Sequence, residues 1–503
     1  MTRNHRLVLL GVAGLYLLVG VLFARVIYPI DDEAVFTNPA YNLITHGNFG
    51  TNIIDHNNTP RGIETRTYWF QPLYPLLLSG WFEVVPVGPF NQRLLSVGWG
   101  LVALGAWFLV SVRLTRNVWC AATVALGLSL DYVLLSAAGT GRMDMMSAAL
   151  SWLSLALYLE SRNPSLPRAV FLACSACALN VVTHPLGAIL GALNLVIVFV
   201  LLDVSRVRFG LLLPAAVPFV LVGGVWAAYI AQSPADFLSQ FFGNVNETGL
   251  AGGATRLSGF ANPLHALWTM LSNIVQGLYG PVDLAARAAS VKVLIPLAHL
   301  TIVGIAVGYP MVRKQIEIRV LVLLCLADFV TLALLNVRGK INYYVHVMPL
   351  LTVLAVLIAW RAPLLPRVPR FVVMAACAIL LVLNGGRLVH SVHYDAYRTN
   401  YLPVQRALRE VIPPKATAFA QAEWAYALGF ERTLHDDLLG FRSGRRPDYA
   451  VLDGKQQYDN AIYLQTIPGF KQYSEMLLMR EYALVYQDAL VRIYRRLSSV
   501  PRD

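Results

Sequence analysis

Charged residues are scarce in this chain. Only 14% of its 503 residues are Asp, Glu, Lys or Arg, while 57% are hydrophobic. Because a soluble domain carries about a quarter charged residues, this composition excludes an ordinary soluble globular protein and predicts a polytopic membrane protein. Acids are the scarcer sign, with 28 Asp and Glu against 40 Lys and Arg. In a membrane protein such a basic excess first indicates positively charged cytoplasmic loops.

Cysteines are also few, and all five lie in apolar stretches: Cys120, Cys174, Cys177, Cys325 and Cys377. This placement excludes a disulfide framework and favours small core residues. Cys174 and Cys177 have the C-x-x-C spacing of a redox pair, but their hydrophobic surroundings favour helix packing. The sequence also lacks zinc-finger spacing and a basic stripe interleaved with aromatic residues, so it gives no indication of nucleic-acid binding.

Long hydrophobic runs, in contrast, are abundant. A span needs about 20 apolar residues, and the sequence predicts eleven spans, near residues 7–28, 93–112, 117–137, 144–160, 169–183, 185–202, 209–231, 290–311, 319–336, 343–360 and 371–390. The first is predicted to be a retained signal-anchor helix. Residues 68–86 and 260–280 are apolar too. We expect them to lie as helices in the outer interface of the membrane, because a further span at 68–86 would invert every later loop.

The N-terminus and alternate short loops share a basic character. Their basic residues are Arg3, Arg6, Arg113, Arg116, Arg162, Arg168, Arg206, Arg208, Arg313, Lys314, Arg319, Arg361, Arg367 and Arg370. The positive-inside rule places this side in the cytoplasm. The sequence therefore predicts a multi-pass protein of a bacterial-type inner membrane, with a cytoplasmic N-terminus and with residues 29–92 as its first extracytoplasmic loop.

The chain changes character near residue 390. Residues 1–390 are predicted to form the transmembrane domain, and residues 391–503 are much more polar. Short strands at 417–420 and 449–452 and a helix at 400–411 are expected there, separated by turn signals such as Pro413-Pro414. We therefore expect a polytopic α-helical protein with a small C-terminal α/β domain outside the membrane.

Three consecutive acids, Asp31, Asp32 and Glu33, follow the first hydrophobic span. Carboxylates packed together repel one another, so the cluster costs stability unless it binds a cation, a proton or a substrate hydroxyl. The simpler interpretation is a solvated start of an acidic loop. The predicted topology favours a site, because the other unusual polar residues fall on the same side of the membrane.

Those other residues occur at three further places. Arg142 and Asp144 stand where one span leads into the next, and His184 precedes a proline at another tip. The third group contains Arg338, Lys340, Tyr343, Tyr344 and His346. Ionisable groups at membrane depth are expensive and functional by default. The alternatives are a helix-terminal ion pair for Arg142 and Asp144, a capping role for His184, and an aromatic belt for the two tyrosines.

The chemistry that these residue types suggest is transfer from a lipid phosphate. Arg338, Lys340, Arg142 and His184 can neutralise a phosphate leaving group. A carboxylate can take the proton of an attacking hydroxyl. Tyr343, Tyr344 and His346 are candidates to line the substrate groove.

Six segments together resemble a known family, the integral-membrane C-type (GT-C) glycosyltransferases, which include protein O-mannosyltransferases and the lipid A aminoarabinose transferase. They are DDEAVFTNPAYNLITHGNFG, QPLYPLLLSGWF, NQRLLSVGWG, GRMDMMSAALSWLSLALYL, THPLG and KINYYVHVMPLL. The likeness lies in their order and spacing over most of residues 1–360. The C-terminal domain matches only in position and size.

The resemblance implies a polyprenyl-phosphate sugar donor and inversion at the anomeric carbon. By the resemblance, the catalytic base maps onto Asp32 or Glu33, with Asp32 preferred, and Asp144 matches a second site acid. His184 and Lys340 match phosphate-side positions. Some relatives use a divalent cation and others none. Asp31, Asp32 and Glu33 are therefore candidate metal ligands, without a metal being required.

The sequence thus predicts an inverting glycosyltransferase that moves sugar from a polyprenyl-phosphate donor to a hydroxyl of a lipid, glycan or protein at the extracytoplasmic face. Membrane lipids are its other expected partners, and nucleic acid is not. One alternative is a lipid or sugar transporter or flippase, for which an inverted repeat is the expected sign. Another is a non-catalytic receptor or assembly factor, which would not need acids and cations at one depth.

Overall fold

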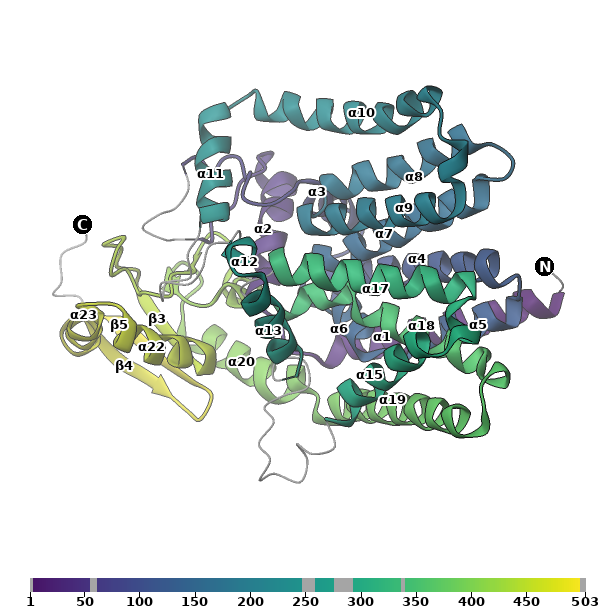
Figure 1. Ribbon diagram of the computed structural model, residues 1–503. Helices are drawn as coiled ribbons and strands as arrows, with labels where there is room; N and C mark the ends of the chain where they lie inside the picture. Colours follow the sequence, from purple (N-terminus) through teal and green to yellow (C-terminus); the bar gives the residue numbers. More distant parts are fainter. Residues whose placement is uncertain (1–2, 55–60, 247–257, 276–292, 336–339, 498–503) are drawn as a thin grey trace.

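The computed structural model describes residues 3–54, 61–246, 258–275, 293–335 and 340–497. A bundle of apolar helices makes up most of it (Figure 1). A small mixed domain formed by the C-terminal residues lies against one end of this bundle, and the N-terminus lies at the other end.

The bundle consists of helices whose side chains are apolar on nearly every face, as expected for elements surrounded by other helices and by lipid. They are α1 (Arg3–Val26), α4 (Pro89–Thr115), α5 (Val118–Ser129), α6 (Tyr132–Gly139), α7 (Met143–Ser161), α8 (Leu166–Val181), α9 (Pro185–Asp203), α10 (Leu212–Ile230), α15 (Leu294–Gly308), α17 (Ile316–Leu335), α18 (Met348–Trp360) and α19 (Arg367–Tyr394). Short turns of helix join some of them: η1 (Val204–Arg206), η2 (Phe209–Leu211), α16 (Pro310–Arg313) and η5 (Ala362–Leu364).

Seven helices of the described chain are long and apolar enough to cross a membrane, or eight if the bent pair α5 and α6 forms one span. The chain is therefore a multi-pass membrane protein, but the predicted count of eleven spans is not confirmed. Helices α8 and α15 are shorter apolar helices. Helix α7 carries an acid near each end, Asp144 and Glu160.

The bend between α5 and α6 measures 60° and occurs at Asp131. The Asp131 carboxylate accepts a hydrogen bond from the Leu134 amide at 2.9 Å and another from the Thr352 hydroxyl at 2.5 Å. These bonds satisfy a helix start inside the bundle, where water is absent. Helix α6 then ends at Gly139, just before the Gly141–Arg142 segment that enters the candidate site.

Shorter helices cover the end of the bundle that faces the C-terminal domain. They are α2 (Asp31–His46), α3 (Leu73–Phe82), α11 (Pro234–Asn246), α12 (Ser258–Ala261), α13 (Pro263–Asn273) and the 3₁₀ helix η4 (Ile341–His346). Helix α3 forms within the predicted interfacial stretch, and its Tyr74, Leu78 and Phe82 pack with Phe36 of α2. The position of α3 in the membrane interface stays a prediction. Residues 276–280 of the second such stretch lie outside the described chain.

The C-terminal domain contains the five-stranded sheet β2-β1-β3-β5-β4. Its strands are β1 (Ala418–Phe419), β2 (Thr433–Leu434), β3 (Tyr449–Asp453), β4 (Tyr482–Gln487) and β5 (Val491–Arg496), and its helical elements are η6 (Tyr397–Tyr401), α20 (Leu402–Val411), η7 (Ala422–Trp424), α21 (Ala425–Leu428), α22 (Gly454–Thr466), α23 (Phe470–Met476) and η8 (Leu477–Glu481). Strand β1 pairs in parallel with β2 and β3, while β5 pairs antiparallel with β3 and β4. The strands predicted near 417–420 and 449–452 and the helix near 400–411 are all present.

The first loop and the C-terminal domain pack directly on each other. Ala34 of α2 shares a buried cluster with Ala422 and Phe430. The His435 amide donates to the Ile53 carbonyl at 2.7 Å. The beginning of α2 is therefore held between the bundle and the domain.

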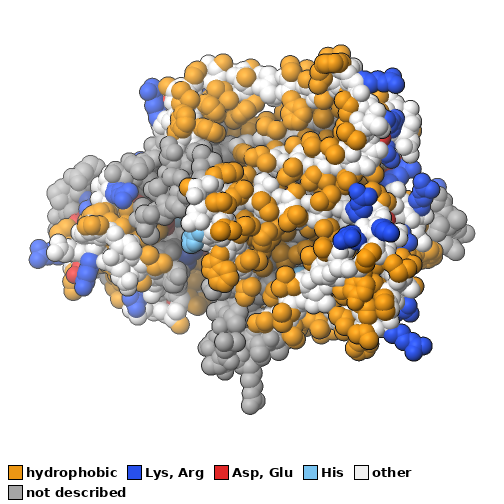
Figure 2. Space-filling view, viewed as in Figure 1, with side chains coloured by type: hydrophobic (Ala, Val, Ile, Leu, Met, Phe, Trp, Pro, Cys, Tyr) orange, Lys and Arg blue, Asp and Glu red, His pale blue; other side chains and the backbone are white. Residues whose placement is uncertain are grey.

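The two ends of the bundle differ in charge. Figure 2 shows Lys and Arg side chains gathered at the end where the N-terminus lies, and a hydrophobic band over the middle of the bundle. Loops α4–α5, α7–α8, α9–α10 and α18–α19 lie at that basic end, as the helix order requires. The acidic start of α2 lies at the opposite end.

Candidate active site

The three acids form the first turn of α2, which begins at Asp31. A helix N-terminus carries partial positive charge and unpaired amide groups, and both stabilise carboxylates there. Glu33 accepts a hydrogen bond from the Ile30 amide at 2.9 Å, which closes the first turn in the manner of a capping box. The sequence therefore supplies its own cap, and the acids are fixed at one end of a rigid helix.

Each of the three acids contacts a different cation. Asp31 Oδ2 lies 3.0 Å from Lys455 Nζ, Asp32 pairs with Arg142, and Glu33 pairs with Arg93. The cations come from α22, from the residue before α7, and from α4. The repulsion expected from the sequence is thus offset by three separate ion pairs.

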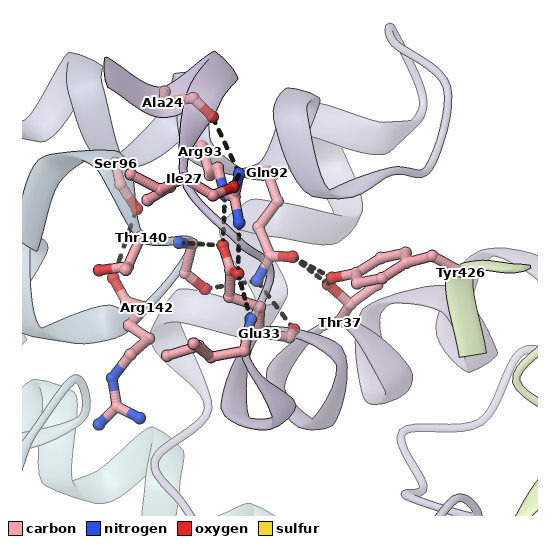
Figure 3. A network of polar contacts seen from close by, with 12 residues as sticks. Ala24, Ile27, Glu33, Thr37, Gln92, Arg93, Ser96, Thr140, Arg142 and Tyr426 are labelled. Carbon is pink, nitrogen blue, oxygen red and sulfur yellow. Dashed lines mark hydrogen bonds and ion pairs between the residues drawn. The ribbon is translucent and has the colours of Figure 1, made fainter. Parts of the chain in front are cut away.

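Glu33 is buried and forms more hydrogen bonds through its carboxylate than the other two acids. Its carboxylate receives two hydrogen bonds from Arg93, at 2.7 and 2.8 Å, and one from the Gly141 amide at 2.7 Å. Arg93 also donates to the Ala24 and Ile27 carbonyls at the end of α1 (Figure 3). Both side chains are buried. Glu33 therefore ties α1, α2, α4 and the 140–142 segment together. This arginine belongs to the segment NQRLLSVGWG, but it was not among the site residues predicted from the sequence.

Asp32 and Asp144 share one guanidinium. Arg142 pairs with Asp32, and its Nε donates to Asp144 Oδ2 at 2.7 Å. Arg142 and Asp144 are both only 2% exposed, whereas Asp32 is 32% exposed. Arg142 also lies over the Phe36 ring, 5.4 Å from its centroid. The predicted Arg142–Asp144 ion pair is present, and Asp32 forms its exposed edge.

His184, Tyr343 and His346 gather on the other side of Asp144. The rings of His184 and Tyr343 meet edge to face at 5.0 Å. Both histidines lie near enough to Asp144 to interact with its charge. His184 also caps α9 through the Gly187 amide at 3.4 Å, as the alternative interpretation expected. The capping role and a site role are compatible, because the cap uses Nδ1 of the ring.

Several buried polar atoms in this region have no hydrogen-bond partner in the described chain. They are Asp144 Oδ1, Ser147 Oγ and His346 Nε2. Unsatisfied buried polar groups are costly, and they are retained most often where a ligand or water completes them. Gly187 allows this region to be so tight, because a Cβ there would lie 2.9 Å from His346 Cε1 and closer still to Ser147 Oγ.

The remaining predicted residues are placed less centrally. Lys340 is exposed and stands one 3₁₀ turn before Tyr343. Tyr344 is fully buried in the core of the helix bundle, so it faces packed side chains and not an open groove. Arg338 lies outside the described residues.

The C-terminal domain contributes residues that were not predicted from the sequence. Lys455 reaches Asp31, and the Tyr426 hydroxyl contacts Gln92, whose amide nitrogen also donates to the Glu33 carbonyl at 3.0 Å (Figure 3). The contacts of Lys455 with Asp31 and of Tyr426 with Gln92 join residues more than 300 positions apart. No local sequence pattern predicts such pairs, so they are found only in the folded structure.

Burial and neighbouring charges shift the pKa values of the residues where α2 meets the C-terminal domain. Burial alone would raise the pKa of Asp31, but Lys455 and then His435 outweigh it and lower that pKa. The pKa of Lys455 is raised, since Asp31 and Glu423 outweigh the effect of burial. For Glu423, burial first and then Asp453 and Asp31 hold the pKa well above its usual value. These effects favour the charged forms of Asp31 and Lys455 and the protonated form of Glu423.

The acids do not form a metal site in this arrangement. Within the described residues, no group of three or more His, Cys, Asp or Glu side chains is placed to hold a metal ion. Asp31, Asp32 and Glu33 point to three different cations, so they do not share one centre. The residues present therefore do not fit the metal site that was considered from the sequence.

Two solved structures resemble this arrangement of helices. ArnT from Cupriavidus metallidurans bound to undecaprenyl phosphate is similar over 100% of both chains, at 14% identity and a TM-score of 0.61. The Archaeoglobus fulgidus oligosaccharyltransferase, tethered with an acceptor peptide, is similar over 97% of this chain and 74% of that chain, at 12% identity and a TM-score of 0.56. Both have the GT-C fold. This chain has the GT-C fold.

The expected resemblance is therefore confirmed at the level of the GT-C fold. No family model matches the sequence, and no curated protein matches it either. Within this fold, α2 lies at the end of the bundle that is next to the C-terminal domain (Figure 1).

Proposed function

We propose that this chain is an inverting glycosyltransferase that moves a sugar from a polyprenyl-phosphate donor to a hydroxyl of a lipid, glycan or protein. The observation that carries the proposal is Asp32, an accessible carboxylate at the edge of the buried Arg142–Asp144 pair in a chain with the GT-C fold. The similar ArnT structure holds undecaprenyl phosphate, and the similar oligosaccharyltransferase holds an acceptor peptide. Both support a lipid-linked donor and a separate acceptor.

In the proposed reaction, the acceptor oxygen attacks the anomeric carbon of the donor sugar. The bond between that carbon and the phosphate oxygen breaks, and polyprenyl phosphate leaves with the electron pair. Asp32 takes the hydroxyl proton as the new bond forms. Attack from the face opposite the leaving phosphate inverts the anomeric carbon. Asp32 is preferred over Glu33 as the base, because four hydrogen bonds occupy the buried Glu33 carboxylate.

Arg142 is the residue that connects the donor to the base. A guanidinium bound to Asp32 makes that carboxylate a weak proton acceptor. A donor phosphate that contacts Arg142 competes with Asp32 for the same charge, while Asp144 keeps the guanidinium in place through Nε. Donor binding would then release Asp32 for its role as base. In this order of events, Asp32 can remove the proton only when the donor and its leaving phosphate are bound.

The other predicted residues complete the proposed donor site. His184 and Lys340, with Arg338 from outside the described chain, would stabilise the phosphate as charge develops on it. Tyr343 and His346 would line the sugar side of the groove, beside the unsatisfied oxygen of Asp144. Asp144 would act by holding Arg142 and by bonding a sugar hydroxyl. Residues 1–390 would form the catalytic domain, and residues 391–503 would cover it.

The orientation is part of the same proposal. The basic end of the bundle would face the cytoplasm and the acidic start of α2 would face the extracytoplasmic side, where lipid-linked sugars are presented. Figure 2 supports this orientation through the concentration of Lys and Arg at the N-terminal end. A bacterial-type inner membrane is the proposed location.

A transfer assay tests the proposed function. Purified protein in detergent is given radiolabelled polyprenyl-phosphate hexoses and pentoses with a membrane lipid and glycan extract. We expect label to move from one donor to an acceptor, and the product to have the opposite anomeric configuration to the donor. A product with retained configuration would overturn the inverting mechanism. Saturable donor binding without transfer, together with donor movement across reconstituted vesicles, would instead establish the transporter alternative.

A further inference from the structure

Lys455 is a basic residue of the C-terminal domain that reaches the acids of α2. Its Nζ donates to Asp31 Oδ2 at 3.0 Å and to Gln421 Oε1 at 2.8 Å. The lysine stands in the first turn of α22, while Asp31 starts α2 more than 400 positions earlier. This ion pair is therefore a contact between the domain and the candidate active site.

A buried network holds the lysine in place. The Gln421 amide nitrogen donates to Gln456 Oε1 at 2.6 Å and to Asp437 Oδ1 at 3.2 Å. Asp453 caps α22 by accepting from the Gln456 amide at 2.8 Å. Gln421, Gln456 and Asp453 are all buried. Lys455 is itself exposed, and exposed lysines usually keep their rotamer freedom and form ion pairs that contribute little. Here the surrounding hydrogen bonds fix where the ammonium group lies.

Asp31 is joined to the proposed base as well as to the lysine. The Asp32 amide donates to Asp31 Oδ1 at 2.9 Å, so one oxygen of Asp31 contacts the backbone of Asp32 and the other contacts Lys455. Two adjacent carboxylates favour sharing a proton, because a like charge nearby penalises ionisation of the second. With Lys455 in place, the charge of Asp31 is offset by a fixed cation.

We propose that Lys455 is a positioning residue of the transferase, which holds Asp31 so that Asp32 alone serves as the base and which makes contact with the C-terminal domain a condition of efficient transfer. This inference rests on the proposed function. It deepens that function by assigning the domain a part in catalysis, although Lys455 is not required to touch either substrate.

The charged groups around Asp31 determine what loss of Lys455 does. They are Asp32 and Glu33 on α2, Arg142 before α7, His435 after β2, Glu423 on η7, Asp453 at the end of β3 and Lys455 itself. Arg142 is already shared by Asp32 and Asp144. Without Lys455, the Asp31 charge therefore acts on Asp32 with less compensation, and the protonated, inactive form of the base becomes more common at mildly acidic pH.

The test compares the pH dependence of transfer in four variants: Lys455→Gln, Lys455→Arg, Asp31→Asn and the double variant Asp31→Asn with Lys455→Gln. In Lys455→Gln, we expect the acidic limb of the kcat profile to move up by about one pH unit. Lys455→Arg keeps the charge and should stay close to wild type. In the double variant the charge that needed a partner is absent, so the acidic limb should return towards its wild-type position.

A purely structural role for Lys455 gives a different result. The folded fraction would then fall equally in Lys455→Gln and in the double variant, kcat per folded molecule would keep its wild-type pH profile, and Asp31→Asn would rescue nothing. That outcome overturns the inference while transfer by the wild type leaves the proposed function intact. If the wild type transfers no sugar from any donor, the proposed function fails, and the inference fails with it.

Discussion

The three acids that open α2 are neighbours in sequence but differ in what surrounds them. Glu33 is buried and fully hydrogen-bonded, Asp31 is bound to a lysine from the C-terminal domain, and Asp32 is the accessible edge of a pair with Arg142. The same functional group thus has three roles, because helix geometry turns successive side chains about 100° apart. A positioning role suits Glu33, and a chemical role suits Asp32.

Removing the charge of Glu33 should damage folding more than chemistry. Glu33→Gln leaves the buried Arg93 guanidinium without its carboxylate, and breaking a buried ion pair costs about 3–5 kcal/mol. We expect a large fall in the thermal unfolding midpoint in detergent. Glu160→Gln is the matched control, because its pair with Arg113 is partly exposed and should change stability by no more than about 1 kcal/mol. Equal midpoints for both variants would contradict the structural role of Glu33.

Glu423 gives a pH-dependent prediction. Its pKa is raised by burial and by Asp453 and Asp31, so the folded protein keeps this side chain protonated to a higher pH than the unfolded chain, which ionises it above about pH 4.3. The contribution of Glu423 to the free energy of unfolding is therefore highest at low pH, where Glu423 is protonated in both states. It falls as pH rises from the unfolded-state pKa towards the raised pKa of the folded state.

The variant Glu423→Gln cannot ionise and should not show this loss. We expect its unfolding midpoint to match wild type near about pH 4 and to exceed it increasingly as pH rises from there towards the raised pKa of Glu423. Glu410→Gln, an exposed glutamate on α20, is the control and should follow wild type throughout. A Glu423→Gln midpoint below wild type at neutral pH would show that the ionised form stabilises the fold.

At the scale of elements, the sequence predicts what local patterns determine. Apolar runs predict α1, α4, α9, α10 and α17, and the short strands β1 and β3 are found within the two short patches predicted as strands near 417–420 and 449–452. The number of spans is not fixed in this way, because α5 and α6 are parts of one bent pair and α8 is only 16 residues long. Length alone does not show how a helix is broken or buried.

Some residues of the candidate site could be predicted from the sequence and others could not. Asp32, Arg142, Asp144 and His184 stand at helix starts, where topology brings them to one end of the bundle, so their proximity could be predicted. The partners Arg93 and Lys455 could not. Arg93 lies inside an apolar helix, and Lys455 lies in a polar domain with many other charges. Only tertiary packing selects them.

The close approach of α9, α7 and η4 depends on Gly187. In Gly187→Ala, the added Cβ would collide with Ser147 Oγ and press on the His346 ring. Overpacking of this kind costs about 1–3 kcal/mol, and we expect a lower unfolding midpoint together with weaker donor use. Gly105→Ala in α4 meets no atom within 4 Å and should be neutral or slightly stabilising. Equal behaviour of both variants would contradict the tight packing around His346.

At the scale of the whole molecule, the protein is polarised along the bundle. One end is basic and contains the N-terminus, and the other end contains α2, the candidate site and the C-terminal domain (Figures 1 and 2). Such polarity gives a membrane protein a defined orientation. In the proposed orientation, the domain would contact both the acids and an acceptor outside the membrane.

Cysteine labelling in intact cells tests this orientation. Asn163→Cys lies in the α7–α8 loop at the basic end, and Gln472→Cys lies on α23 of the domain; both positions are exposed. A membrane-impermeant maleimide should label Gln472→Cys from outside and label Asn163→Cys only after lysis. The native cysteines are buried or half-buried, so they add little background. The reverse pattern would invert the proposed topology.

The most direct test of the central claim is the transfer rate of Asp32→Asn with the donor that the wild type uses. Asparagine keeps the shape of the side chain and removes the base, so we predict a normally folded protein whose kcat falls about 10²-fold or more. Asp395→Asn is the matched control, because asparagine also adopts the left-handed conformation found at Asp395, and it should transfer at the wild-type rate. Wild-type turnover by Asp32→Asn would contradict the assignment of Asp32 as the base and, with it, the account of how this site works.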